Sequence, residues 1–133
     1  MTRIRKRIGR MRPFFYPQLQ QVSIDPSGIT DIAAATGIEI QNVTMRIQGA
    51  AGSVTISATP GIAAEFMIDG FEVTLIGQSD TNTVTLQDES SLTGSGFVLE
   101  DAINKTLGKG DTLKLILNLS EKKWYQSSPL VDN

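Results

Sequence analysis

The chain has 133 residues and a formal net charge of −2, with 40% hydrophobic residues, no cysteine and no histidine. This length suits one domain of about 100–200 residues. Without cysteine there can be no disulfide, thiolate nucleophile or zinc ribbon, and without histidine there is no Ser-His-Asp triad or imidazole base. We therefore expect a protein that is not an enzyme, has no catalytic residues, and uses neither a metal nor a cofactor.

Positive charge gathers at the beginning of the sequence. Residues 1–12 hold six basic residues and no acidic one, whereas residues 13–133 hold six basic and 14 acidic residues, so the two parts carry net charges of +6 and −8. A separate basic segment favours contact with an anionic partner. It lacks the apolar stretch of a signal peptide, and no part of the chain has the ~20 apolar residues of a transmembrane helix. The six basic residues are Arg3, Arg5, Lys6, Arg7, Arg10 and Arg12.

An aromatic triplet follows the basic residues. Phe14, Phe15 and Tyr16 lie between two prolines, and proline removes a backbone donor and favours extended geometry in the residue before it. We expect residues 1–28 to form an extended arm with little structure of its own. Exposed aromatic side chains are unfavourable in a free monomer, so the triplet is predicted to pack on a partner. The alternative is that it covers the chain's own body, residues 29–133.

The body begins with a short turn and two alternating runs. Thr30 or Asp31 is suited to cap a turn over 32–35, which ends at Gly37. Apolar and polar residues then alternate over 43–48 and again over 53–58. Because a short link bounded by glycines separates the two runs, they predict a β-hairpin.

Further short runs continue the β pattern to the end of the chain. They are separated by Gly, Asn, Asp and Ser, which favour turns. Strands at intervals of about ten residues are typical of an all-β sandwich or barrel, so we expect a compact antiparallel sandwich or barrel. A turn is predicted over 106–110. The predicted strands cover residues 71–76, 83–87, 97–99, 111–118 and 124–127.

The supply of bulky core residues is small, because aromatic residues make up only 6% of the chain. A thin core with many strand edges is often completed by pairing subunits. We therefore expect an oligomer. The side chains predicted to pack the core or the subunit interface are Phe71, Leu75, Leu86, Phe97, Leu113, Leu115, Leu117, Trp124 and Tyr125.

Residues 66–128 also resemble a module that recurs in virion proteins of tailed bacteriophages, in fibres, spikes and capsid decoration proteins. The resemblance rests on four pieces in order: Gly70-Phe-Glu-Val-Thr-Leu, Thr83-Val-Thr-Leu-Gln-Asp, Gly110-Asp-Thr-Leu-Lys-Leu and Trp124-Tyr. It implies a β module that is typically trimeric. The chain is too short for the shaft of a fibre, and a basic arm on an acidic body is similar in plan to a decoration, or cement, protein.

That resemblance implies a homotrimeric knob on the capsid surface of the virion. The arm would clamp neighbouring subunits of the major capsid protein, with its basic residues on acidic capsid surface and its aromatic triplet as apolar anchors. Three tethered arms would act at high effective concentration. No small-molecule substrate or membrane partner is expected.

Other functions stay open at this point. The body could belong to a small tail or fibre-tip protein that faces a host receptor and binds a surface glycan. The arm could instead bind packaged DNA, although the acidic body disfavours nucleic acid. Two adjacent acidic pairs, Asp88-Glu89 and Glu100-Asp101, are expected to be solvated turns rather than a glycosidase pair. Loop carboxylates near Asp80 or Asp88-Glu89 could also hold Ca²⁺.

Overall fold

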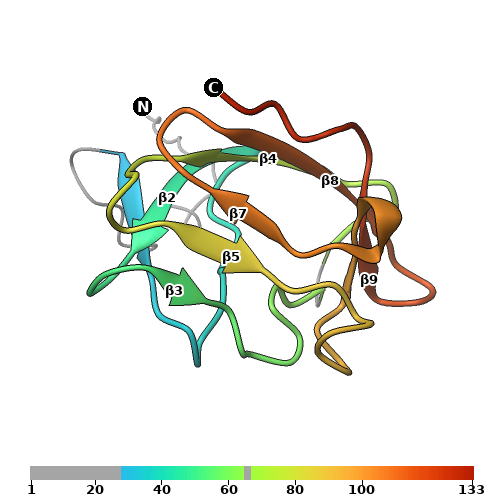
Figure 1. The fold of residues 1–133 in the computed structure, drawn as a ribbon. Coiled ribbons are helices and arrows are strands. Elements are labelled where there is room, and N and C mark those ends of the chain that lie inside the picture. The colour runs from blue at the N-terminus through green and yellow to red at the C-terminus, as the bar shows by residue number, and fades with distance from the viewer. Residues whose placement is uncertain (1–27, 65–66) are drawn as a thin grey trace, which may run out of the picture.

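The computed structural model describes residues 28–64 and 67–133, and this part of the chain is nearly all β-structure (Figure 1). The all-β prediction is confirmed. The predicted arm, apart from Gly28, lies outside the described residues. The elements are β1 (Ile29–Ile32), β2 (Thr44–Gly49), β3 (Val54–Thr55), β4 (Glu72–Gly77), β5 (Val84–Leu86), β6 (Phe97–Val98), the 3-10 turn η2 (Glu100–Ala102), β7 (Lys105–Leu107), β8 (Thr112–Asn118) and β9 (Lys123–Gln126).

The strands form two sheets that enclose one core, as in a β-sandwich. The larger sheet has six strands in the order β1-β2-β4-β8-β9-β6, and the smaller has three in the order β3-β5-β7. Figure 1 shows β3, β5 and β7 side by side in front of the sheet that contains β2, β4 and β8. Side chains from both sheets enter the same buried cluster, with Leu75 and Leu113 from the larger sheet and Val84 and Leu86 from the smaller.

Strand pairing is mixed rather than antiparallel throughout. Four described pairs are parallel, β1–β2, β2–β4, β3–β5 and β6–β9. Three are antiparallel, β4–β8, β5–β7 and β8–β9. The antiparallel expectation is therefore wrong for more than half of these pairs. Parallel neighbours need long crossover connections, and in three of the four pairs, β2–β4, β3–β5 and β6–β9, the connection includes a strand of the other sheet.

The alternation of the sequence fits a layer with one buried side. In β4 and β8 every second residue is fully buried, at Val73, Leu75, Leu113, Leu115 and Leu117. Successive side chains of a strand point to opposite faces, so the residues between them form the outer face of the sheet. The core is closed by Phe97 and Trp124, whose side chains are 0% exposed. The Trp124 indole N–H donates to the backbone oxygen of Ile62 at 3.2 Å.

The predicted hairpin over 43–48 and 53–58 is wrong. Both runs contain strands, but β2 pairs with β1 and β4, whereas β3 pairs with β5 in the other sheet. Gly49 explains the crossover, because a Cβ there would lie 1.9 Å from the backbone oxygen of Gly52. The tight approach turns the chain away from β2 and toward the loop before β5, where Gly49 N–H donates to the Asn82 carbonyl oxygen at 2.8 Å.

Two short strands were not predicted. Residues 29–32, interpreted as the start of a capped turn, form β1, and the turn follows at 34–36. Residues 105–107, assigned in part to a turn, form β7, and that turn begins after them. Both strands lie at sheet edges, where a short run gains hydrogen bonds from one neighbour only.

Candidate binding face

The described residues contain none of the predicted arm contacts. The six basic residues of the arm, Phe14, Phe15 and Tyr16 all lie outside the described residues. The structure therefore describes the body that these residues adjoin.

Seven of the nine predicted packing residues lie inside the single chain. The seven are at most 2% exposed, so a neighbouring copy cannot contact them without opening the sandwich. Phe71 is half-buried and meets Trp124 edge to face, with ring centroids 6.3 Å apart. Tyr125 points to the outer face of the six-stranded sheet. The seven core residues are Leu75, Leu86, Phe97, Leu113, Leu115, Leu117 and Trp124.

Tyr125 belongs to a row that crosses the outer face of the six-stranded sheet. In the registered strands Glu72 lies opposite Ile116, Ile116 opposite Tyr125, and Tyr125 opposite Val98. Ile116 is 37% exposed. Such cross-strand neighbours have Cβ atoms about 4.5–5.5 Å apart, so this row is a continuous strip that begins with a carboxylate and continues with apolar and aromatic side chains.

Two open hollows adjoin this row, and both are lined by Tyr125. The first has a volume of about 820 Å³ and is lined by residues of β8, β9 and the loops beside them, including Asp69, Ile116 and Ser120. The second, of about 350 Å³, is lined by Val98, Glu100 and residues 126–129. Among residues 28–64 and 67–133, neither lining contains a basic side chain. The two hollows are called here the Tyr125 face.

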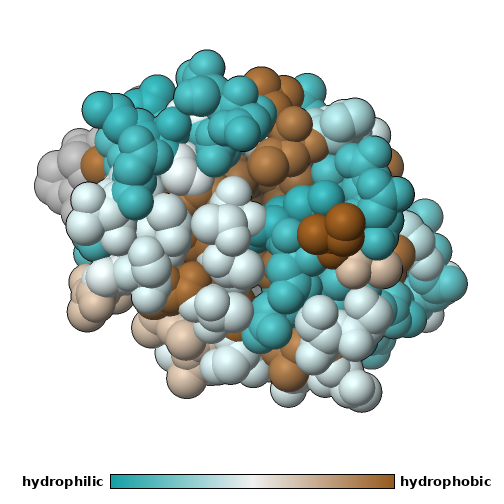
Figure 2. All heavy atoms as spheres, in the orientation of Figure 1, coloured by the Kyte–Doolittle hydropathy of each residue, from teal (hydrophilic) through white to brown (hydrophobic). Residues whose placement is uncertain are grey.

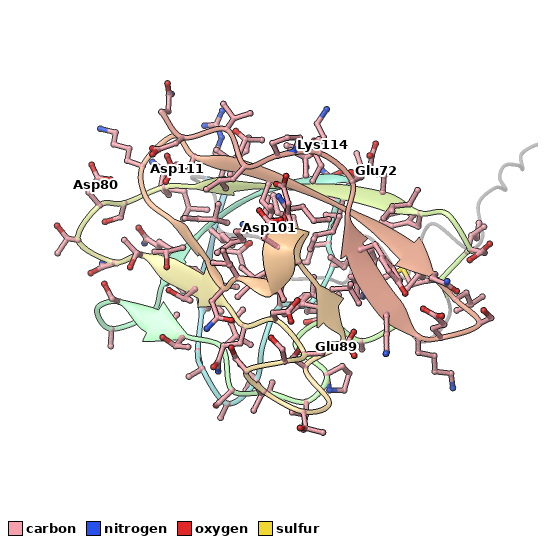
Figure 3. All side chains as sticks on the ribbon, turned by 45° about the vertical axis from the view of Figure 1, so that its right-hand side comes forward. Glu72, Asp80, Glu89, Asp101, Asp111 and Lys114 are labelled. Atoms are coloured by element: carbon pink, nitrogen blue, oxygen red, sulfur yellow. The ribbon has the colours of Figure 1, made fainter. Side chains whose placement is uncertain are left out.

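Carboxylates lie in and beside the two hollows that Tyr125 lines. Its hydroxyl donates to a carboxylate oxygen of Glu121, and this hydrogen bond raises the pKa of Tyr125 above its usual range. Glu72 accepts from the Ser127 hydroxyl at 3.0 Å at the second hollow. Figure 3 shows Glu72 on the upper side of the molecule, near Lys114 of the neighbouring strand. Together with Asp69 and Glu100, these groups give the Tyr125 face an acidic rim.

The nearest basic side chain on β9 is already paired. Lys123 Nζ lies 2.8 Å from Glu89 Oε1, and this contact raises the pKa of Lys123. Both side chains are about one-third exposed, so the pair contributes little to stability. Lys123 still attracts Glu121 and Tyr125, so it offsets part of the negative charge at the Tyr125 face.

The outer face of the three-stranded sheet has a different character. Thr55, Thr85 and Thr106 stand in one registered row across β3, β5 and β7. The Thr85 and Thr106 hydroxyls lie 2.7 Å apart. The Ser53 and Thr83 hydroxyls beside them lie 2.9 Å apart. Figure 2 shows pale surface, neither strongly hydrophilic nor hydrophobic, over the part of the molecule where Figure 1 places β3 and β5.

One of the two acidic pairs is not a solvated turn. Asp88 is 3% exposed and accepts from the backbone N–H groups of Leu99 at 2.7 Å and Ser90 at 2.8 Å. Burial raises the pKa of Asp88, but these hydrogen bonds outweigh it and hold the pKa below the usual range. Asp88 thus fastens the loop after β5 to the segment after β6. Glu100 and Asp101 are exposed in η2, as expected of a polar turn.

Carboxylates near the β7–β8 turn are also used by the backbone. Asp80 accepts from Lys109 N–H at 2.8 Å, and Asp111 accepts from Gly108 N–H at 2.8 Å. Asn133 N–H, which also donates to Asp111, is the main cause of the lowered pKa of that carboxyl. Figure 3 shows Asp80 and Asp111 at the same end of the molecule. In residues 28–64 and 67–133 no group of three or more acidic side chains is placed to hold a metal ion.

The alternation of the sequence also indicates where the Tyr125 face lies. Trp124 and Tyr125 were both assigned to packing, but period-two alternation puts neighbouring residues on opposite faces. Since Trp124 points inward, Tyr125 has to point outward. The hollows themselves are formed by loops from distant parts of the chain, and no local pattern indicates them.

Comparisons with known proteins do not identify a relative. No family model, no curated protein and no solved structure matches this chain. Among the described residues, no helix is long and apolar enough to cross a membrane.

Proposed function

We propose that this chain is a structural protein of a tailed-bacteriophage virion, a capsid decoration or cement protein. In this proposal it forms a homotrimer on the capsid surface and bridges subunits of the major capsid protein. Residues 1–28 provide the anchor and residues 29–133 the knob. It acts without catalysis or a cofactor.

The division of charge carries this proposal. Six basic residues fall within residues 1–12, and a net charge of −8 is left on residues 13–133. A basic segment can hold the acidic body to a partner that has acidic patches of its own. A protein shell built from many copies of one subunit presents such patches repeatedly. Charge-assisted hydrogen bonds from Arg to carboxylate are the strongest contacts available to such a segment.

The body supports a structural role in two ways. Its sandwich presents the edges of short strands, β1 and β6 in one sheet and β3 and β7 in the other, and such edges can pair with another chain. Large apolar side chains are also exposed on it, Ile68 by 75% and Val131 by 59%. A neighbouring copy or a capsid subunit would bury both features, which favours an assembled state.

The first experiment measures assembly in solution. The full chain is examined by light scattering at low and high salt, and we expect the mass of three chains at both. Apolar contacts between subunits persist at high salt, whereas exposed ion pairs are screened. A monomer at both salt concentrations contradicts the trimeric knob.

The second experiment measures attachment to the head. The full chain is mixed with phage heads that lack it and sedimented with them, beside a variant in which the six basic residues of residues 1–12 are glutamine. We expect the variant to remain trimeric and to lose most of its binding. The matched control replaces Arg46, Lys105, Lys109 and Lys114 of the body with glutamine, and it should still bind.

Two results would contradict the cement role. If the six-glutamine variant binds heads as well as the original chain, the basic residues are not the anchor. If the original chain binds double-stranded DNA with a steep salt dependence and does not bind heads, an internal DNA-binding role replaces the proposal. Altered host adsorption after changes in the body loops would instead favour a receptor-facing tail protein.

A further inference from the structure

The Tyr125 face matches the chain's own first residues in chemistry. We propose that, in the free protein, residues 3–16 dock on the Tyr125 face of the same chain. The inference concerns the protein before it meets any partner, and it does not depend on the cement role.

The apolar part of the match is aromatic. Phe14, Phe15 and Tyr16 form a run of three rings, and the two hollows offer the side chains of Ile116, Tyr125 and Val98 as an apolar strip. Aromatic side chains bury large areas and gain further from edge-to-face contact with another ring. Tyr125 lines both hollows, so consecutive aromatic residues have two adjoining places to enter.

The charged part of the match is equally direct. Six basic residues precede the aromatic triplet, and the rim of the Tyr125 face carries four carboxylates. Within the part of the chain that the structure describes, no basic side chain lines either hollow. Attraction between these groups is strongest at low salt and weakens as the screening length falls. The rim carboxylates are Asp69, Glu72, Glu100 and Glu121.

The connecting segment is long enough to reach the face. Gly28 directly precedes β1 at one edge of the six-stranded sheet, and β9 lies four strands away. Neighbouring strands are about 4.8 Å apart, which gives a crossing of about 19 Å. The twelve steps from Tyr16 to Gly28 span up to about 40 Å when extended. The chain therefore reaches Tyr125 from its own β1 with length to spare.

The charges along this path agree with the crossing. The outer face between β1 and the hollows carries Arg46 on β2 and Lys114 on β8. The connecting residues 17–27 have a single charged side chain, Asp25. A nearly neutral segment with one carboxylate is suited to pass two cations, and the strongly basic residues come only beyond it, where the rim is acidic.

The opposite face of the sandwich is a poorer match. Its threonine row pairs hydroxyls with one another, as at Thr85 and Thr106, and it lacks the apolar strip. It is nevertheless within reach, because Ser57 N–H beside Thr55 donates to the Ala34 carbonyl oxygen just after β1. The arm can therefore also reach this face from the start of β1, which makes it an internal control.

The absence of native cysteine allows a direct test. One variant carries Gln18→Cys with Ser120→Cys at the first hollow, and the control carries Gln18→Cys with Thr55→Cys on the threonine row. Both body positions are exposed, and the aromatic triplet is kept. A short bis-maleimide is added to each full-length variant at low protein concentration, which limits cross-links between chains. Mass spectrometry then measures the cross-link formed within one chain.

We expect at least about five times more cross-link at Ser120 than at Thr55 at low salt. The ratio should fall toward one at 1 M salt, where the screening length is about 3 Å. Replacing the six basic residues of residues 1–12 with glutamine, or Tyr125 with alanine, should reduce the cross-link at Ser120 and leave that at Thr55 unchanged.

Four results would overturn the proposal. Equal cross-linking at both positions means that the arm has no preferred face, and no cross-link at Ser120 means that it docks elsewhere. Products with the mass of two chains assign the Tyr125 face to the arm of a neighbouring copy. If a cysteine variant does not fold, backbone NMR shifts decide. The six-glutamine variant must then differ from the original chain at 98–100, 116–120 and 125–128, and unchanged shifts there overturn the proposal.

Discussion

The two outer faces of the sandwich carry different kinds of side chain. On the three-stranded sheet, threonine and serine hydroxyls bond to one another across the strands, as Thr85 does with Thr106. On the six-stranded sheet, an apolar strip crosses the strands and ends beside two hollows with an acidic rim. One face pairs its hydroxyls across the strands, whereas the other exposes apolar side chains beside carboxylates that are hydrogen-bonded within the chain and keep their negative charge.

The two outer faces differ because their outward side chains differ, whereas the inward side chains of the two sheets are alike. Both sheets contribute the same kind of inward side chain, such as Leu86 from one and Leu115 from the other. The outward positions are therefore free to differ, with Thr85 in one sheet and Ile116 in the other. Stability resides mainly in the shared inner layer, so it can be changed separately from either face.

Trp124→Ala should have the largest effect and should break both faces at once. Its side chain is 0% exposed and its indole N–H is bonded to Ile62, so removal leaves a cavity and an unpaired carbonyl. We expect a loss of about 3–5 kcal/mol in the free energy of unfolding, measured in urea.

The next residue on the same strand is the matched control. Tyr125→Ala removes a ring from the outer face only, so it should cost less than about 1.5 kcal/mol while reducing docking of the arm. An equal loss of stability in the two variants would contradict the separation of inner layer and outer face.

Gly77→Ala should have the next largest effect, because Gly77 lies where the two sheets are joined. Its N–H and carbonyl oxygen bond to Asp111 and Gly110 in the turn between β7 and β8. A Cβ at Gly77 would lie 1.9 Å from the backbone oxygen of Gly108, and backbone cannot move aside easily. We expect a cost of about 1–3 kcal/mol in thermal or urea unfolding.

Gly108→Ala on the other side of that contact is a milder change. Its Cβ would lie 2.7 Å from Asp80 Oδ1. This exposed side chain can rotate away by giving up its hydrogen bond from Lys109 N–H, so the cost should stay below that of Gly77→Ala. A larger loss of stability in Gly108→Ala than in Gly77→Ala would contradict this, because it would mean that the backbone of the turn adapts less easily than that of β4.

Asp88 makes the molecule sensitive to acid. Its pKa in the folded state lies below the ordinary value of 3.8, so its contribution is complete above pH 3.8 and is lost as the pH falls through the folded value. Asp88→Asn should cost about 1–3 kcal/mol at neutral pH and should flatten the decline of thermal stability below pH 4. Asp101→Asn, at an exposed position, should match the original chain at both pH values.

The sequence predicts the inward side chains well because alternation is a local property. The residues buried in β4, β5 and β8 all follow from period two, including Leu75, Leu86 and Leu113. The same rule places Tyr125 outside and Trp124 inside. What a strand buries can be read from its own residues, whichever sheet it joins.

Strand pairing and the hollows depend on distant residues and could not be predicted. Alternation over 43–48 and 53–58 is equally compatible with one hairpin and with two separate sheets, and the choice is made by β4 and β5. Asp88 was assigned to a solvated turn because its partner, Leu99 N–H, is eleven residues away and belongs to no motif. The first hollow likewise joins Asp69 to Ser120 across about fifty residues.

Thr85→Val should have the smallest effect, and it tests whether the threonine face is self-contained. Valine keeps the β-branched shape that suits a strand but removes the hydroxyl beside Thr106. Since Thr106 is exposed, water can replace the lost partner, and the change in unfolding free energy should stay within about 1 kcal/mol. Ile116→Thr, the opposite exchange on the other face, should also leave stability nearly unchanged but should weaken docking of the arm. If Thr85→Val weakened docking as much as Ile116→Thr, the arm would not distinguish the two faces, and the contrast between them would describe composition without consequence for binding.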